Sequence, residues 1–323
     1  MSKKNFKVQN VLVTGCTGFI GFNLCNNLLL LNSNVIGIDN LSASYDSSIQ
    51  TNRLKKLKEH NNFSFIKADL LNFSKIKKIL KKYNIDIIIH LAANVGVRES
   101  ILEPLKYVDN NIKATNNLLE LCRLYDINQF IFSSSSSVYG NNNGALKETM
   151  LPHPTSPYGV SKRSCELYGE TYSYLYSVNF CSLRLFSVYG PHQRPDMAIH
   201  RFVHAIRQDK PIVVYGDGST KRDFTYVDDI VKGFMKATKK RLKFEIINLG
   251  TGKSISLSSL IKKIEQYTGK KAKIIYKAKY RSDAVETLAD ITKAKELLDY
   301  EPKVTIDEGL KKYISWVEKN SNL

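Results

Sequence analysis

The chain has 323 residues, of which 43% are apolar and 10% aromatic, which is enough for one large domain or two closely packed ones. No apolar run approaches the roughly 18 residues of a membrane span, so we expect a cytoplasmic protein without a membrane partner. The net charge of +18 comes from lysines spread over helical segments rather than from a dense basic arm. We therefore expect no nucleic-acid binding, and only a modest attraction for a polyanionic substrate.

The first half of the chain alternates short β-branched runs with helical patterns. Strands are expected at residues 11–15, 34–40, 63–70, 85–93 and 129–135, and helices at 19–31, 74–83, 110–125 and 157–176. Strands that alternate with helices imply βαβ units and a parallel sheet covered on both faces. The sequence thus predicts an α/β protein with a Rossmann-type, doubly wound parallel sheet.

The second half is less regular and predicts a smaller, mixed α/β substrate lobe. Strands are expected at 181–186 and 244–250, and amphipathic helices at 257–268 and 306–319. We assign residues 1–184 to the cofactor domain, with 224–250 returning to it. Residues 185–223 and 251–323 form the second lobe.

Five cysteines lie scattered through the chain, without a C-x-x-C pair or a nearby histidine. This spacing suggests neither a disulfide framework nor a metal site. We expect buried, reduced thiols and no bound metal.

The run "TGCTGFIG" places Gly15, Gly18 and Gly21 between a predicted strand and a predicted helix. Glycines in this pattern permit a tight turn, and a dinucleotide pyrophosphate can rest at the positive helix N-terminus. Three glycines can also simply mark a strand-to-helix turn, so the pattern alone is a weak signal.

Two carboxylates follow at strand ends. Asp39 comes eighteen residues after Gly21, where a carboxylate can accept both ribose hydroxyls and repel a 2′-phosphate, which favours NAD over NADP. Asn40 could equally supply the turn there. Asp69 suits the adenine amino group, although a turn leading into a helix would use it as well.

Tyr158 and Lys162 lie four residues apart in "PYGVSK", on a predicted long helix. Residues at this spacing share a helix face, so the phenol and the ammonium can point at one ligand. The ammonium, together with an oxidised nicotinamide, is expected to lower the phenol pKa and let Tyr158 act as a base. The same spacing also occurs by chance on many helices.

The motifs "TGCTGFIG", "HLAANVGVRES", "SSSSSVYG", "PYGVSK" and "RDFTYVDDI" together resemble the extended short-chain dehydrogenase/reductase family of nucleotide-sugar epimerases and dehydratases. The resemblance covers essentially the whole chain. It implies a tightly held NAD, a UDP- or dTDP-sugar in the second lobe, and a catalytic trio of Ser135, Tyr158 and Lys162. It also suggests a homodimer formed through the helices near 103–125 and 157–176.

The family motifs carry further site residues by position. The NAD-binding positions are Gly15, Gly18, Phe19, Ile20, Gly21, Asp39, Asn40, Asp69, Leu70, Leu91, Ala92, Ala93, Asn110, Tyr158 and Lys162. The substrate-binding positions are Val97, Arg98, Ser135, Ser136, Ser137, Tyr158, Ser187, Arg194, Arg222 and Arg281. Arg222 matches a family arginine at the UDP phosphates, whereas the motif around Arg281 is one residue shorter than the family's and lacks its glycine.

The two residues after Ser135 discriminate between members of the family. The 4,6-dehydratases typically carry Asp-Glu there to eliminate water, and UDP-glucuronate decarboxylases usually carry a Glu, whereas this chain has Ser136 and Ser137. Hydroxyls cannot readily do that proton work, so both reactions are disfavoured.

The string "RPDMA", which begins at Arg194, resembles UDP-glucuronate 4-epimerases. Ser136, Ser137 and Ser187 could donate hydrogen bonds to a sugar carboxylate, and Arg194 could add a bidentate charge; a surface or phosphate-binding arginine is the alternative. We expect an NAD-dependent 4-epimerase that interconverts UDP-glucuronate and UDP-galacturonate through a 4-keto intermediate. The alternatives are epimerisation of UDP-N-acetylglucosamine, its uronic acid or UDP-glucose, a 4,6-dehydratase, and a non-catalytic NAD-binding protein.

Overall fold

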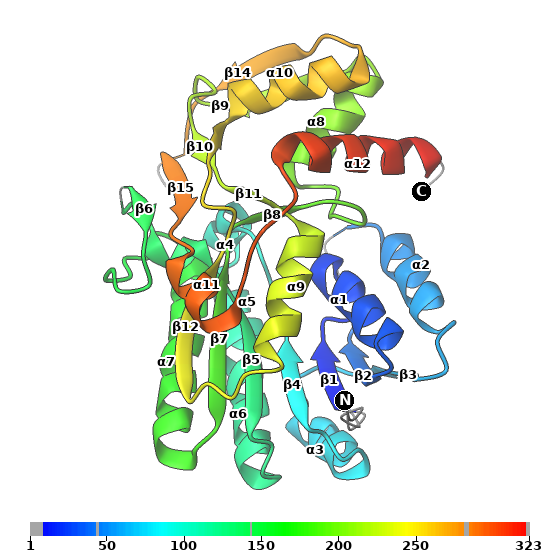
Figure 1. Cartoon of the computed structure of the whole chain (residues 1–323), viewed down its shortest axis with the longest axis vertical. Helices are drawn as coiled ribbons and strands as arrows, with labels where there is room; N and C mark the ends of the chain where they lie inside the picture. The colour runs from blue at the N-terminus through cyan, green and yellow to red at the C-terminus, as the bar shows by residue number, and fades with distance from the viewer. Residues whose placement is uncertain (1–8, 43–44, 143, 281–283, 321–323) are drawn as a thin grey trace, which may run out of the picture.

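The computed structural model describes residues 9–42, 45–142, 144–280 and 284–320. Its central feature is a seven-stranded sheet of order β12-β7-β5-β4-β1-β2-β3, in which all neighbours are parallel (Figure 1). The strands are β1 (Asn10–Thr14), β2 (Asn34–Asp39), β3 (Phe63–Lys67), β4 (Ile87–His90), β5 (Gln129–Ser135), β7 (Asn179–Leu185) and β12 (Phe244–Leu249). This topology confirms the predicted Rossmann-type fold.

Helices cover both faces of the sheet because its strands carry apolar side chains on both sides. Along β1, Val11 and Val13 pack into one buried cluster, whereas Leu12 packs into another. The first cluster includes residues of α1 (Phe19–Leu30), α2 (Ser47–Leu57), α9 (Val227–Ala237) and α11 (Thr292–Leu298). The second includes residues of α3 (Phe73–Lys82), α6 (Ala114–Leu124) and α7 (Pro157–Tyr176).

A smaller lobe lies over the carboxyl ends of the strands, at the top of Figure 1. It has its own buried apolar cluster, built around three helices: α8 (Ala198–Arg207), α10 (Leu257–Thr268) and α12 (Ile306–Lys319). Its short strands are β8 (Ser187–Tyr189) with β11 (Phe224–Tyr226), and β9 (Pro211–Tyr215) with β14 (Lys273–Lys277). Ligands of open parallel sheets bind at the carboxyl ends of the strands, so the two lobes frame the expected site.

The chain passes between the two lobes more than once. A four-stranded sheet of order β13-β10-β15-β6 joins β6 (Ala145–Leu146) to β10 (Lys221–Arg222), β13 (Ile255–Ser256) and β15 (Glu286–Ala289). In turn, β12 returns to pair with β7. We retain the predicted domain division as a proposal. Residues 1–184 and 224–250 form the cofactor domain, and residues 185–223 and 251–323 form the second lobe.

Several predicted elements differ from the observed ones. The helix expected over 110–125 is a π-helical segment, η1 (Val108–Lys113), which continues into α6. The strands expected at 63–70 and 85–93 are shorter, at 63–67 and 87–90. All five cysteines are free and buried, as predicted. Among the described residues, no helix has both the length and the apolar character that a membrane span requires.

Candidate active site

The glycine-rich turn lies tightly against the end of β4. Gly15 has a φ of +69°, and a Cβ there would lie 2.8 Å from the backbone nitrogen of Ala92. Gly18 is the N-cap of α1, and no side chain caps that helix end. The turn therefore leaves a cradle that a Cβ would fill, beside a helix N-terminus suited to a pyrophosphate. These features fit a dinucleotide such as NAD.

Asp39, the last residue of β2, is buried next to this turn. Its Oδ2 accepts a hydrogen bond from the backbone N–H of Thr17 at 3.1 Å, and its Oδ1 accepts one from Leu41 at 2.9 Å. Asn40 donates to Asp69 at 3.3 Å. The predicted adenosine-binding carboxylates thus lie on adjacent strand ends, where the side chain of Asn40 bridges to Asp69.

The end of β4 is fixed by a buried polar chain that the sequence did not predict. Thr14 Oγ1 accepts from the backbone N–H groups of Leu91 and Ala92, each at 3.2 Å, and lies 2.7 Å from Nδ1 of His90. His90 Nε2 lies 3.0 Å from Thr115 Oγ1. Burial, assisted by the charge of Lys162, lowers the pKa of His90 to about 3, so this imidazole is neutral and structural.

The predicted catalytic trio lies where β5 ends and α7 begins. Ser156 caps α7 by accepting from the backbone N–H of Gly159 at 3.1 Å, which places Tyr158 in the first turn. Ser135 is the last residue of β5, and its side chain acts to lower the pKa of the Tyr158 phenol. Lys162 is buried one turn further along, and its Nζ donates to the carbonyl of Ser133 at 2.7 Å.

Several groups act on the Tyr158 phenol. Burial raises the pKa of the phenol, while the hydrogen bond from Ser135 and the charge of Arg194 lower it. The Lys162 ammonium donates to Ser133 and lies 6.0 Å from the Tyr158 ring centroid. Burial lowers the pKa of Lys162 itself to about 8.

The serines after Ser135 form a 3₁₀ turn, η2 (Ser136–Tyr139), whose N-cap is Ser135. Ser135 Oγ accepts from the backbone N–H of Ser137 at 3.1 Å and from the Ser137 hydroxyl at 2.9 Å. The turn contains hydroxyls but no carboxylate, so it lacks an acid or base for eliminating water.

Arg194 forms an ion pair with Asp196, which the sequence did not predict. Its Nε donates to Oδ1 at 2.9 Å, and its Nη2 donates to Oδ2. Two nitrogens of the Arg194 guanidinium are thus bonded to a carboxylate of the same loop, in a bidentate pair. Ser187, the first residue of β8, donates its backbone N–H to the carbonyl of Asp223 at 2.9 Å.

The remaining predicted arginines lie in different surroundings. Arg98, in α4 (Val97–Leu102), stacks over the rings of Tyr215 and Tyr280 in the second lobe, at 4.1 and 4.4 Å from their centroids. Arg222, in β10, donates to the carbonyl of Lys221. Arg281 lies outside the described residues.

Asn110, a predicted NAD-binding residue, donates to the carbonyl of Lys106 at 3.1 Å. The neighbouring residue, Asn111, has the buried side chain. The side chain of Asn111 bonds both the N–H and the carbonyl of Asn94 and donates to Ser161 on α7. This link between the segment after β4 and helix α7 was not predicted from the sequence. The repeated Asn in "VDNN" could have indicated it.

A buried ion pair beneath the trio was also missed. Glu166, on α7, accepts from Arg184 on β7 at 2.9 Å and 2.7 Å, and from the Ser134 hydroxyl at 2.7 Å. Burial raises the pKa of Glu166, but the bonds and charge of Arg184 outweigh it and hold this pKa below its ordinary value. The sequence did contain a sign of this ion pair: an arginine inside the apolar run "CSLRLF" must be buried, and a buried charge requires a partner.

Another buried arginine joins the cofactor turn to the substrate lobe. Arg53 Nη1 donates to the carbonyl of Thr17 at 2.8 Å, and its Nη2 donates to the carbonyl of His192 at 2.6 Å. His192 stands two residues before Arg194. The loop that carries the predicted substrate arginine is therefore tied to the predicted NAD turn.

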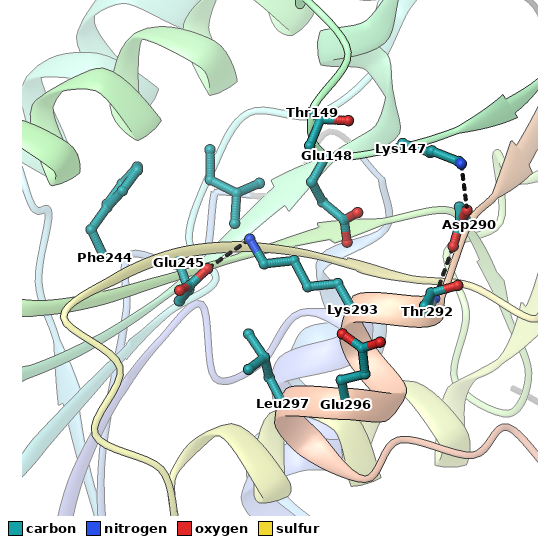
Figure 2. A pocket seen from close by; sticks show the side chains of 11 residues that line it. Lys147, Glu148, Thr149, Phe244, Glu245, Asp290, Thr292, Lys293, Glu296 and Leu297 are labelled. Atoms are coloured by element: carbon teal, nitrogen blue, oxygen red, sulfur yellow. Dashed lines mark hydrogen bonds and ion pairs between the residues drawn. The ribbon is translucent and has the colours of Figure 1, made fainter.

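A cavity of about 660 Å³ lies away from the trio, between α11, β12 and the segment 147–149 (Figure 2). Lys293 points across it to Glu245 at 2.6 Å, and Lys147 lies 3.8 Å from Asp290. It contains none of the predicted site residues. Over the described ranges, no cluster of three His, Cys, Asp or Glu side chains could hold a metal ion.

Comparison with known proteins gives consistent matches over nearly the whole chain. The family described as GDP-mannose 4,6 dehydratase matches residues 12–313. A UDP-glucuronate 4-epimerase of Thermodesulfobacterium geofontis is 44% identical over 314 residues, which cover 97% of either chain. The crystal structure of Bacillus cereus UDP-glucuronic acid 4-epimerase with UDP-glucuronic acid and NAD is 39% identical, with a TM-score of 0.91, covering 96% of this chain and 99% of that one. A Thermotoga maritima UDP-glucose 4-epimerase with UDP-glucose has a TM-score of 0.90 at 34% identity, covering 97% and 100%.

We expect Glu166→Gln to lower the free energy of unfolding by about 3–5 kcal/mol, because it leaves the Arg184 charge buried without its partner. Urea denaturation measures the loss. Adding Arg184→Met should recover part of it, since the uncompensated charge is then gone. Glu120→Gln, which breaks a more exposed pair with Arg123 on α6, is the matched control and should change little. Equal effects of Glu166→Gln and Glu120→Gln would contradict the structural role of the buried pair.

Proposed function

Because this chain belongs to the extended short-chain dehydrogenase/reductase family described as GDP-mannose 4,6 dehydratase, we propose that it is an NAD-dependent UDP-glucuronate 4-epimerase. The observation that carries the proposal is the polar environment of Tyr158. The Ser135 hydroxyl and the charge of Arg194 both act on the phenol, and Ser135 begins a turn of hydroxyls that continues to Ser137. This set can bind a carboxylate but offers no acid or base for dehydration.

The residues of the chain have separate tasks in this reaction. NAD, when bound at the glycine-rich turn, would supply the hydride acceptor and donor for C4. Tyr158 takes the proton of the C4 hydroxyl and later returns it, and Ser135 holds the same oxygen by a hydrogen bond. Lys162, anchored on Ser133, orients the end of β5 against α7. The sugar passes through a 4-keto stage, presents its opposite face, and leaves with C4 inverted.

The carboxylate contacts also have a chemical purpose. A 4-keto glucuronate is a β-keto acid, which loses carbon dioxide most easily when the bond to the carboxyl carbon aligns with the carbonyl π system. The carboxylate would be held by Ser136, Ser137, Ser187 and Arg194, which would limit that alignment. The roles of these residues, and of Arg98, Arg222 and Arg281 as substrate contacts, are part of our proposal.

Epimerisation of a neutral sugar, UDP-glucose or UDP-N-acetylglucosamine, is the second candidate. It is favoured by the ion pair between Arg194 and Asp196, since a guanidinium that is already paired needs no carboxylate from the substrate. The similarity to the Thermotoga maritima UDP-glucose 4-epimerase points the same way.

We also propose that the protein acts in the cytoplasm as a homodimer. The five free, buried cysteines suit a reducing compartment. Exposed apolar side chains gather on α4, α5 (Pro104–Tyr107) and α7: Leu102 is 82% exposed, Leu105 is 77% exposed, and Leu167 and Leu175 are about half exposed. Contiguous exposed apolar patches often mark protein–protein interfaces, and we propose that a second copy of the chain covers this one.

Incubation with UDP-glucuronate, UDP-glucose and UDP-N-acetylglucosamine in separate tubes tests the function. The sugar H4 signal in NMR should report inversion of UDP-glucuronate, and Tyr158→Phe should lower its rate by about 10²–10⁴-fold because the base is lost. Inversion of a neutral sugar without any turnover of UDP-glucuronate would overturn the proposal in favour of the second candidate.

Replacement of the ion pair tests the carboxylate site. The double variant Arg194→Gln/Asp196→Asn removes both charges together, so no unpaired carboxylate remains. We expect kcat/KM for UDP-glucuronate to fall about 10- to 100-fold, as for the loss of one or two charge-assisted hydrogen bonds. The value for UDP-glucose should change far less. Equal losses on the two sugars would contradict a carboxylate role for Arg194.

The dimer is tested by light scattering during gel filtration. We expect the mass of two chains for the wild type and a shift toward one chain for Leu105→Asp/Leu167→Asp, because charges in an apolar interface are costly. Leu31→Asp, on another exposed leucine, at the C-cap of α1, is the control and should leave the mass unchanged. A monomeric wild type would refute this part of the proposal.

A further inference from the structure

Arg53, in α2, is a buried cation whose bonded partners are all uncharged. It is 1% exposed. Its Nη1 donates to the carbonyl of Thr17 at 2.8 Å and to the hydroxyl of Tyr45 at 3.0 Å, and its Nη2 donates to the carbonyl of His192 at 2.6 Å. Its Nε is buried without a hydrogen-bond partner in the described part of the chain. Burying a guanidinium without a bonded counter-charge is costly, so stability alone does not account for this residue.

One of the two carbonyls belongs to the glycine-rich turn of the cofactor site. Thr17 is fully buried, and its other polar groups are also bonded. Its N–H donates to Asp39 at 3.1 Å, and its hydroxyl accepts from Gln50 at 3.1 Å. Gln50 and Arg53 lie three residues apart on α2 and so share one helix face. Helix α2 therefore holds the turn at a residue that is bonded on every side.

The other carbonyl belongs to His192, in the loop that leads from β8 to α8. His192 has a φ of +64°, in the left-handed region that residues with a side chain rarely occupy. Its ring packs edge-on against Phe22 of α1 and Trp316 of α12, with centroid distances of 4.5 and 4.9 Å. A backbone conformation of this kind persists only where the surroundings determine it. His192 is thus held by its ring between the two lobes and by its carbonyl on Arg53.

The loop continues from His192 directly to the proposed substrate arginine. One residue, Gln193, separates His192 from Arg194. Two residues of extended chain span at most about 7 Å, so a displacement of the His192 carbonyl is passed on to Arg194. The ion pair between Arg194 and Asp196 lies within the loop and does not connect it to the cofactor turn. Arg53 makes that connection.

We propose that Arg53 is a positioning residue for the epimerase reaction: by bonding the carbonyls of Thr17 and His192 with one rigid guanidinium, it sets the distance between the NAD site and the loop that carries Arg194. The inference rests on the proposed function and adds a residue to it. The planar fork suits this task because its two terminal nitrogens keep a constant spacing. Hydride transfer requires the reacting atoms to lie about 3–3.5 Å apart, and the link holds the loop at one spacing from the turn for both transfers.

Arg53→Met tests the inference, since methionine is a long side chain that makes neither hydrogen bond. We expect kcat of the NAD-loaded enzyme to fall about 10²-fold, with little change in KM, because a misplacement of about 1 Å has an effect of that size. The loss should appear on every UDP-sugar that the wild type inverts. Arg53→Lys keeps the charge but replaces the fork by a single ammonium, so it should recover only part of the rate.

Gln50→Met is the matched control. It removes a hydrogen bond from the same helix face to the same turn, at Thr17, and keeps the link between Arg53 and His192. We expect its kcat to stay near the wild-type value. Rates are expressed per folded, NAD-loaded protein, which thermal unfolding and the content of bound NAD determine. If Arg53→Met does not fold, Arg53→Lys carries the test with the same expected direction.

Trp316 gives a second readout that does not depend on catalysis. It is the only tryptophan of the chain, and its ring packs on His192. Loosening of the loop in Arg53→Met should make Trp316 fluorescence easier to quench with acrylamide than in the wild type and in Gln50→Met. This measurement separates the inference from the proposed function. A wild type that inverts no UDP-sugar would refute the function, whereas the quenching still reports whether Arg53 holds the loop.

Four results would overturn the inference. Wild-type kcat in Arg53→Met would show that the link does not position the sugar. A loss that disappears when NAD is supplied in excess would mean that Arg53 serves cofactor binding alone. Full activity of Arg53→Lys would show that the charge matters and the double link does not. Unchanged quenching of Trp316 in Arg53→Met would show that the loop is held by other contacts.

Discussion

The proposed active site at the carboxyl end of the sheet depends on one buried interaction, the ion pair between Glu166 and Arg184. It joins the middle of α7 to β7, and through Ser134 it also holds β5 one residue before Ser135. Removing two charges from water is costly unless every partner is in place, so only one alignment of these elements is favourable. The pair thereby fixes the positions of Ser135 and Tyr158 relative to one another.

The same network reaches the edge of the sheet. The Arg184 guanidinium lies 4.6 Å from the centroid of the Tyr139 ring, and the Tyr139 hydroxyl donates to Asn248 on β12 at 2.7 Å. Three parallel strands and the η2 turn are therefore connected through polar side chains inside an otherwise apolar core. Such a network favours a single alignment of the strands that it joins.

The sequence was sufficient for features that depend on local pattern. Continuous apolar runs located the parallel strands, the spacing of Gly15, Gly18 and Gly21 located the turn before α1, and Ser156-Pro157 begins the catalytic helix as a capped start should. It was insufficient where a side chain chooses between partners. Arg194 could have been free for a substrate, but Asp196 two residues away competes for it. For Arg98, predicted as a substrate contact, nothing in the sequence indicated that two tyrosines from distant segments stack on it. The π-helical segment at Val108–Lys113 likewise follows from packing against α7 rather than from propensity, which favoured an ordinary helix.

The late position of β12 in the chain has a consequence for how the protein is made. As the ribosome releases the chain in order, β7 emerges with β5 on one side and nothing on the other, and its partner follows only with residues 244–249. During that interval the growing sheet has an open edge of apolar sequence, which is prone to pair with other chains. The nascent protein should therefore need protection by chaperones until Asn248 reaches Tyr139, and a chain truncated before that point should aggregate.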